Sequence, residues 1–322
     1  VLAACVGLVA YDRYVEQGPN QEASLFYIAP GESLRRTALR AEEAGLVANK
    51  DELWLWARIT GRAGAIRAGE YAVPAHASLK ALLWLFTKGE HHRRYATIVE
   101  GLSSYEVWEV LLLAEGLKAP EMDAINIQDI PEGSILPETY DYQYGETLEA
   151  LTARMQAALK RELDAAWLSR APDLPFDSKE EALILASIIE KETGLADERD
   201  LVAAVFINRL RRGMRLQSDP TVLYGMGLGK PYEGDLTRAD LQEVTPYNTY
   251  RINGLPPTPI AHAGKASIHA ALHPADVPYL YFVADGTGGH AFAVTLEEHN
   301  KNVARWRLIE RQAWLELNGD TQ

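Results

Sequence analysis

The chain has 322 residues, enough for one large domain or two smaller ones. Hydrophobic residues make up 47% of the sequence and charged residues 24%, which excludes an intrinsically disordered protein. The formal net charge of −13 argues against a protein that tracks phosphates, so we expect no nucleic-acid partner. The single cysteine, Cys5, excludes an internal disulfide framework.

The N-terminal stretch Val1–Tyr11 is apolar and uncharged, and polar residues follow it. Crossing a bilayer takes about 20 residues. Because the chain starts at Val and not Met, we expect further residues upstream and interpret 1–24 as a membrane anchor remnant followed by a linker. A lipoprotein processing box that ends at Cys5 is the alternative, although Val6–Ala10 stay apolar after this cysteine.

Residues 25–95 show the patterns of a small α+β module. Strands are predicted at 25–30 and 67–73, with two helices between them and a third helix that opens at Ser78. This order of elements resembles the LysM-like fold, a module that grips glycan chains. A spacer that holds the next domain away from the membrane remains an equal alternative.

Residues 96–322 are expected to form a larger, mixed α+β domain with its core at 176–300. Its predicted elements before the core are a helix from Ser103 or Ser104, a loop at 131–145 and a helix at 147–167. Two strands within 279–294 are predicted to form a hairpin around a glycine-rich turn.

The stretch LILASIIEKET, residues 183–193, predicts a short helix that stops at Gly194. Glu192 continues the apolar stripe of this helix, and Glu190 points away from it. A carboxyl group in apolar surroundings has a raised pKa and can stay protonated, as a general acid requires. Taken alone, the stretch favours a helix that simply ends in solvent. The stripe consists of Leu185, Ile188 and Ile189.

A second helix is predicted from Asp197, as its N-cap, to Gly213, which makes a helical hairpin around Gly194. Asp219 precedes a proline and is expected to be extended. Amide, hydroxyl and tyrosine side chains follow, together with a proline-rich wall at 254–260, and this combination suits a polyhydroxylated ligand. The residues predicted to bind sugar or to support the acid are Glu190, Gln217, Asp219, Thr221, Tyr224, Tyr247, Asn248 and Tyr250.

His269 and His273 are four residues apart, a spacing that allows two metal ligands on one helix. Pro274 ends the segment and a third ligand is not evident, so we expect no metal site. We also expect no cofactor.

Five blocks within 183–294 closely resemble, in sequence and in order, the MltG (YceG-like) family of endolytic murein transglycosylases. They are ASIIEKET, VFINRLRRGMRLQSDPTVLYG, TPYNTY, GLPPTPIA and YLYFVADGTGGHAF. The resemblance implies a single-pass protein of the bacterial inner membrane with a periplasmic catalytic domain. It further implies cleavage of the MurNAc–GlcNAc bond of nascent peptidoglycan strands without water, which leaves 1,6-anhydro-MurNAc ends and can terminate strand elongation.

The resemblance places the family's catalytic glutamate at Glu192, the second Glu of EKET, which would act as acid and then as base. The segments at His262 and His273 depart from the Asn-Pro-Gly and Asn-Pro of many members, which puts any role of these histidines in doubt. Glu190 and Glu192 lie about 200° apart around a helix, so they cannot flank a sugar as two-carboxylate hydrolases require. Asp219 could supply a second carboxylate, which leaves a hydrolytic muramidase open. A noncatalytic scaffold that binds peptidoglycan and recruits synthases also remains open.

Overall fold

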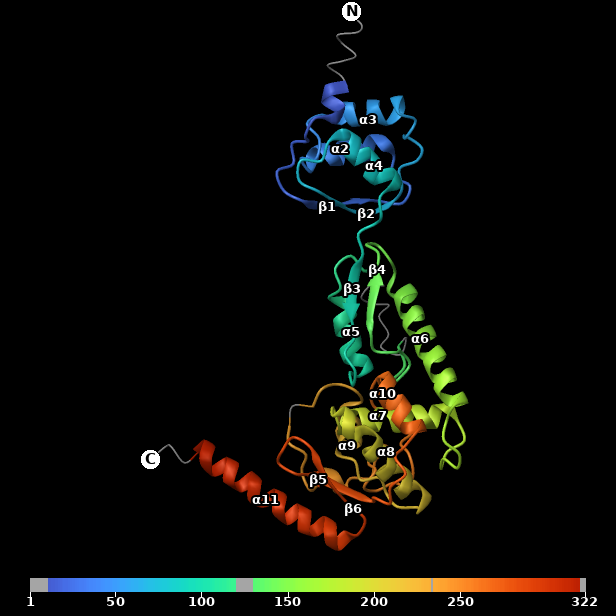
Figure 1. Ribbon diagram of the computed structural model, residues 1–322, viewed down its shortest axis with the longest axis vertical. Coiled ribbons are helices and arrows are strands. Elements are labelled where there is room, and N and C mark those ends of the chain that lie inside the picture. The colour runs from blue at the N-terminus through green and yellow to red at the C-terminus, as the bar shows by residue number, and fades with distance from the viewer. Residues whose placement is uncertain (1–10, 120–129, 233, 319–322) are drawn as a thin grey trace, which may run out of the picture. The chain divides into compact units, whose positions relative to one another are not determined.

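The computed structural model describes residues 11–119, 130–232 and 234–318 (Figure 1). These residues form helices and two-stranded sheets, which confirms the predicted mixed α+β class. The chain divides into two compact units. The first contains the described residues up to Ala96 together with 114–118 and 141–147, and the second contains the remainder.

The first unit is a pair of antiparallel strands packed against helices. β1 (Ser24–Ile28) pairs with β2 (Gly69–Val73), and apolar residues of the strands and helices together form the core. The helices are α2 (Leu34–Glu43), α3 (Lys50–Ile59) and α4 (Leu79–Lys88). The predicted order of strands and helices is confirmed, whereas the LysM-like assignment stays a prediction.

The predicted linker is partly wrong, because its residues pack against this module. Tyr14 is buried, and its ring stacks on Trp56 with the centroids 4.3 Å apart. Asn20 donates a hydrogen bond of 2.7 Å to the carbonyl of Pro74. The apolar stretch 1–10, with the predicted anchor and Cys5, lies outside the described residues. Within the part of the chain that the structure describes, no helix combines the length and hydrophobicity that crossing a membrane requires.

The chain next forms β3 (Arg94–Thr97) and α5 (Ser104–Leu112), followed by β4 (Thr139–Tyr142) and α6 (Leu148–Leu168). β3 and β4 form a two-stranded sheet. The predicted loop at 131–145 therefore contains a strand. Tyr140 and Tyr142 alternate with more exposed residues and are buried, a strand period that proline and glycine on either side obscured.

The second unit has a helical centre flanked by a strand hairpin (Figure 1). α7 and α8 pack against each other and both contact α10, and α11 runs along β5 and β6. The elements are α7 (Lys179–Glu192), α8 (Ala196–Arg211), α9 (Asp219–Gly227), the 3₁₀ helix η3 (Asp240–Gln242), α10 (Lys265–Leu272), β5 (Tyr281–Ala284), β6 (His290–Ala293) and α11 (Leu296–Asn318).

Three helix starts differ from the prediction. α7 begins at Lys179, because Ser178 and Glu181 form a capping box one turn before the predicted start. α8 begins at Ala196, so Asp197 lies inside the first turn and is not the cap. Asp219 is helical because Pro220 sits in the first turn of α9, where its missing N–H costs no hydrogen bond.

Candidate functional site

Glu192 lies in the last turn of α7, at the end of the buried stripe. The apolar residues of that stripe are completely buried, and the helix ends because Thr193 is extended (φ −145°, ψ 131°). Oε1 of Glu192 accepts a hydrogen bond of 2.5 Å from Oγ of Ser218. The end of one helix and the start of another, α9, therefore meet at this carboxyl group.

Burial raises the pKa of Glu192 to about 7. The hydrogen bond from Ser218 favours the charged form and lowers this pKa, and the negative charge of Asp219 raises it. His290 and Arg209 act in the lowering direction. Desolvation is the largest effect, so the carboxyl group is about half protonated at neutral pH, as a group that both donates and accepts protons requires.

Ser218 is the residue of this site that the sequence reasoning missed. It is the N-cap of α9, yet its hydroxyl makes no cap hydrogen bond and instead donates to Glu192. Its backbone N–H donates to Oγ1 of Thr249 at 2.9 Å, and its carbonyl accepts from Oγ1 of Thr221 at 2.7 Å. A serine directly before Asp-Pro was a signal for a cap, but the sequence could not show that its hydroxyl is used elsewhere.

We expect Ser218→Ala to raise the pKa of Glu192 further, because the variant loses a donor that stabilises the carboxylate. An NMR pH titration of the Glu192 side-chain carboxyl in both proteins measures this shift. Ser169→Ala is the matched control, since the Ser169 hydroxyl donates to the carbonyl of Ala166. An unchanged or lowered pKa in Ser218→Ala would contradict the expectation.

Asp219 and Tyr250 form a second polar pair next to Glu192. The Tyr250 hydroxyl donates to Oδ1 of Asp219 at 2.5 Å. Burial and the hydrogen bond to Asp219 raise the pKa of Tyr250, which keeps this hydroxyl protonated. Asp219 is exposed and close enough to Glu192 for its charge to raise the acid's pKa. The structure therefore brings Glu192, Asp219 and Tyr250 together.

Two other predicted residues, Asn248 and Thr221, support the backbone around Ser218 and Tyr250. Asn248 is completely buried, and its amide nitrogen donates to the carbonyls of Asp240 and Glu243. Its amide oxygen accepts from the N–H of Tyr250 at 3.0 Å. Thr221, in the first turn of α9, is also completely buried, and its hydroxyl contacts the carbonyl of Ser218 and Oγ1 of Thr249. Both side chains hold the loop in shape and are not exposed to a ligand.

Within the described part of the chain, the remaining predicted residues make no hydrogen bond to Glu192 and have other surroundings. Gln217 is exposed and has a left-handed backbone conformation, with φ 52°. Tyr224 and Tyr247 pack together, with ring centroids 4.9 Å apart. Oε2 of Glu190 accepts from the N–H of Gly264 at 2.9 Å, which ties α7 to the start of α10 and agrees with a supporting role.

Arg209 is buried and fixes the backbone on both sides of the site. Its Nε donates to the carbonyl of Leu280 and its Nη1 to the carbonyl of Leu216, both at 2.6 Å. Its guanidinium lies 5.3 Å from the centre of the Tyr281 ring. A weak signal for this role was present in the sequence, since Arg209 lies among the mostly apolar buried residues of α8.

His290 is held by Glu198 through two contacts. The backbone N–H of His290 donates to Oε1 of Glu198 at 2.8 Å, and the ring Nδ1 lies 2.7 Å from Oε2. The pair fixes the start of β6 on α8, and His290 contributes to the field at Glu192. These two residues are 92 positions apart in the chain, so no local pattern predicts their contact.

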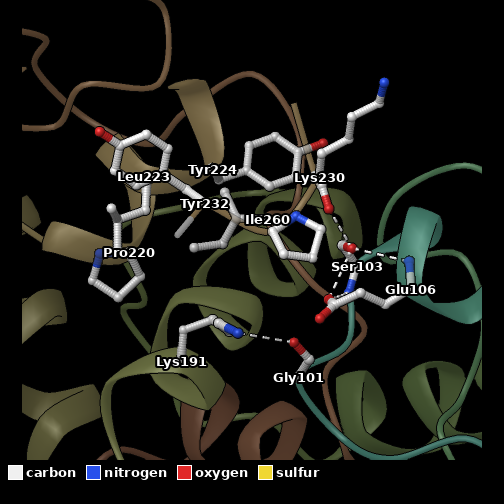
Figure 2. A pocket seen from close by; sticks show the side chains of 12 residues that line it. Gly101, Ser103, Glu106, Lys191, Pro220, Leu223, Tyr224, Lys230, Tyr232 and Ile260 are labelled. Carbon is white, nitrogen blue, oxygen red and sulfur yellow. Dashed lines mark hydrogen bonds between the residues drawn. The ribbon is translucent and has the colours of Figure 1, made fainter. Parts of the chain in front are cut away.

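A pocket of 360 Å³ lies beside the end of α7 (Figure 2). Lys191 and Pro220, the sequence neighbours of Glu192 and Asp219, form part of its wall. The rest of the lining includes Ser103, Glu106, Leu223, Tyr224, Lys230, Tyr232 and Ile260.

Glu132 is a second buried carboxyl group, close to Tyr224. Its Oε1 accepts from the N–H of Ser104 at 2.9 Å and lies 3.9 Å from Nε2 of His262. Burial raises the pKa of Glu132 to about 7 and lowers that of His262 to about 3. Ser104 contacts the same Nε2 at 3.2 Å. A nucleophile triad needs the acid on the other ring nitrogen, so this cluster is structural.

Glu132→Gln should remove a pH-dependent cost of about 3 kcal/mol from the folded state at pH 8. Between the ordinary pKa of 4.5 and the folded pKa of about 7, the unfolded chain ionises first, so the free energy of unfolding falls as pH rises. Urea unfolding at pH 5 and pH 8 measures the difference. The variant should gain stability over the native protein at pH 8 relative to pH 5. An equal difference at both pH values would contradict the burial argument.

The described residues contain no group of three or more His, Cys, Asp or Glu side chains that could hold a metal ion. His269 and His273 stack with ring centroids 4.1 Å apart. The ring nitrogens of His273 lie 3.2 Å from the carbonyl of His269 and 2.7 Å from that of Ser169. The His273 ring is therefore engaged with the backbone.

A buried carboxyl group with a raised pKa, bonded to the Ser218 hydroxyl and close to Asp219, thus lies at the centre of the candidate site on an α+β fold. A family model described as the YceG-like family matches residues 26–305, so the chain belongs to this family. This confirms the family predicted from the sequence blocks.

Two curated relatives share 177-residue matches with the chain. It is 39% identical to the endolytic murein transglycosylase of Bacillus subtilis (strain 168), over 55% of this chain and 48% of the relative. It is 35% identical to the protein of the same name from Streptococcus pneumoniae serotype 2 (strain D39 / NCTC 7466), over 54% of this chain and 32% of the relative. The matches thus span about half or less of the relatives' length.

A crystal structure of a YceG-like protein from Listeria monocytogenes has a similar fold, with a TM-score of 0.54 and 26% identity. The likeness covers 87% of this chain and 98% of that one.

Proposed function

We propose that this protein is a lytic murein transglycosylase that cuts the MurNAc–GlcNAc bond of peptidoglycan strands. The observation that carries the proposal is the pKa of about 7 at Glu192, which suits one group to both acid and base catalysis at neutral pH. The names of the two curated relatives support it.

In this mechanism Glu192 first donates its proton to the glycosidic oxygen as the bond to C1 of MurNAc breaks. The Ser218 hydroxyl then stabilises the carboxylate through its hydrogen bond. Glu192 next takes the proton of the C6 hydroxyl as O6 bonds to C1, which closes the 1,6-anhydro ring without water. The negative charge of Asp219 lies close enough to stabilise the positive charge that develops at the sugar ring.

The same proposal includes the cellular location of the protein and the role of its first unit. The protein acts on the periplasmic side of the bacterial inner membrane, attached by an N-terminal helix, and its first unit is a LysM-like module that binds glycan. Cutting nascent strands there would terminate their elongation beside the peptidoglycan synthases. Fusing a reporter enzyme that is active only outside the cytoplasm to the C-terminus of the protein as the cell produces it tests the placement.

A hydrolytic muramidase is the second candidate, because Asp219 is near Glu192 and could activate a water molecule. The two reactions are distinguished by incubating the protein with uncrosslinked glycan strands. The masses of the products are then measured by mass spectrometry. A transglycosylase leaves anhydro ends, which are lighter by one water than the reducing ends of a hydrolase. Intact strands would instead favour a noncatalytic scaffold.

A further inference from the structure

The pocket beside α7 differs in character from the site around Glu192. One wall is apolar and aromatic, with Pro220, Leu223, Tyr232 and Ile260 facing the space, as Figure 2 shows. Its volume of 360 Å³ falls in the range of small-ligand sites. None of these side chains takes part in the acid–base step, so the pocket has no assigned role in the mechanism above.

Two ammonium groups stand at this pocket, on a chain of net charge −13. Nζ of Lys191 donates to the carbonyl of Gly101 at 3.1 Å, which leaves two of its three N–H donors for another partner. Nζ of Lys230 lies 5.6 Å from the centre of the Tyr105 ring. Among the residues that the structure describes, neither lysine is in an ion pair with a carboxylate.

The one carboxylate in the pocket lining is already engaged. Oε2 of Glu106 accepts from the N–H of Ser103 at 2.8 Å and from its hydroxyl at 2.9 Å, as the capping box of α5. Its negative charge therefore stabilises the N-terminus of α5. The pocket combines two available cations with an apolar wall, which matches a ligand that carries a carboxylate on a short apolar body.

The position of the pocket, next to the candidate acid, indicates which ligand with a carboxylate and an apolar body it binds. Lys191 directly precedes Glu192 and Pro220 directly follows Asp219 in the sequence, so the pocket is lined by chain neighbours of both carboxyl groups. The sugars of a peptide-bearing strand are neutral, because the lactyl carboxyl group of MurNAc forms an amide bond with the peptide. The lactyl group of MurNAc, however, carries a stem peptide of small residues with free carboxylates. A MurNAc held at the acid can extend this peptide into a neighbouring pocket.

We propose that the pocket is a stem-peptide subsite, in which Lys191 and Lys230 each bind a different carboxylate of the peptide and the apolar wall holds an alanine side chain. The proposal rests on the proposed function for the identity of the sugar chain. It makes the protein prefer strands that carry peptides over strands from which an amidase has removed them.

Binding is measured by calorimetry in the Glu192→Gln background, which prevents turnover. The probes are a GlcNAc–MurNAc disaccharide with its peptide and the same disaccharide with its lactyl carboxyl group capped as a methylamide, which carries no charge. We expect the peptide to tighten binding about tenfold, as charge-assisted hydrogen bonds would provide. Lys191→Gln with Lys230→Gln should abolish this preference, and Lys230→Glu alone should reduce it. Lys301→Gln is the matched control, since it removes an exposed charge on α11.

Equal affinity for both probes would overturn the subsite. So would lysine variants that weaken both probes equally, because the pocket would then bind sugar. Whether the protein catalyses the proposed reaction is measured separately, as the formation of anhydro ends by the native protein on peptide-free strands. Absence of those ends together with a lysine-dependent preference for the peptide would reject the reaction and retain the subsite.

Discussion

Glu192→Gln should lower the rate of glycan cleavage by about 10²–10⁴-fold, the range that general acid catalysis contributes. The amide cannot donate the proton that the leaving oxygen needs. It still offers an oxygen to the Ser218 hydroxyl, so the hydrogen bond that joins α7 to α9 is retained. The measurement is the rate of appearance of new chain ends, with thermal unfolding as the check on folding.

Glu180→Gln is the matched control for this experiment, because Glu180 lies on the same helix but is exposed in its first turn. The control should cleave glycan at the native rate. A folded Glu192→Gln protein that remained fully active would show that Glu192 is not the general acid. In the native protein, the rate should fall as pH rises through about 7, because the protonated acid is lost.

Arg209→Leu should reduce the free energy of unfolding by about 3 kcal/mol, since it leaves two buried carbonyls without a donor. The melting temperature should fall by roughly 6–12 °C for a domain of this size. The carbonyls belong to Leu216 and Leu280, which precede Ser218 and β5. Cleavage should weaken as well, because the loop that positions the Ser218 hydroxyl loses its attachment to α8.

Arg211→Leu provides the comparison for this substitution. Arg211 lies two residues further along α8, is exposed, and makes one hydrogen bond of 3.0 Å to the carbonyl of Asp173. Its loss should cost less than about 1 kcal/mol. Equal destabilisation by the two variants, measured by urea unfolding, would show that Arg209 does not anchor the site.

Periodicity and turn residues predicted most of the elements, because each depends on neighbours in the chain. The apolar spacing of α7 placed Glu192 on the buried face of the helix, although taken alone it favoured a helix that ends in solvent, and the glycine-rich turn predicted the pairing of β5 with β6. The helix starts at Lys179 and Ala196 were missed, since boundaries depend on which backbone groups a side chain caps.

The contacts that shift the pKa of Glu192 could not be predicted from the sequence, because they join residues that are far apart in the chain. Ser218 meets Glu192 across 26 positions, and Arg209 reaches Leu280 across 71. Burial also depends on packing from many segments, so Asn248 could be predicted as polar and useful, but not as fully enclosed by its own loop. Glu132 gave no local sign, because its burial depends on α5 and on the segment around His262.

The two buried acids also mean that this protein takes up protons when it folds. Glu132 and Glu192, each with a pKa of about 7, are both half protonated at pH 7, whereas both are ionised in the unfolded chain. Folding at neutral pH therefore takes up protons at these two carboxyl groups. These two groups are correspondingly less negative in the folded protein than the formal charge of −13 counts them, and the heat of folding depends on the ionisation enthalpy of the buffer.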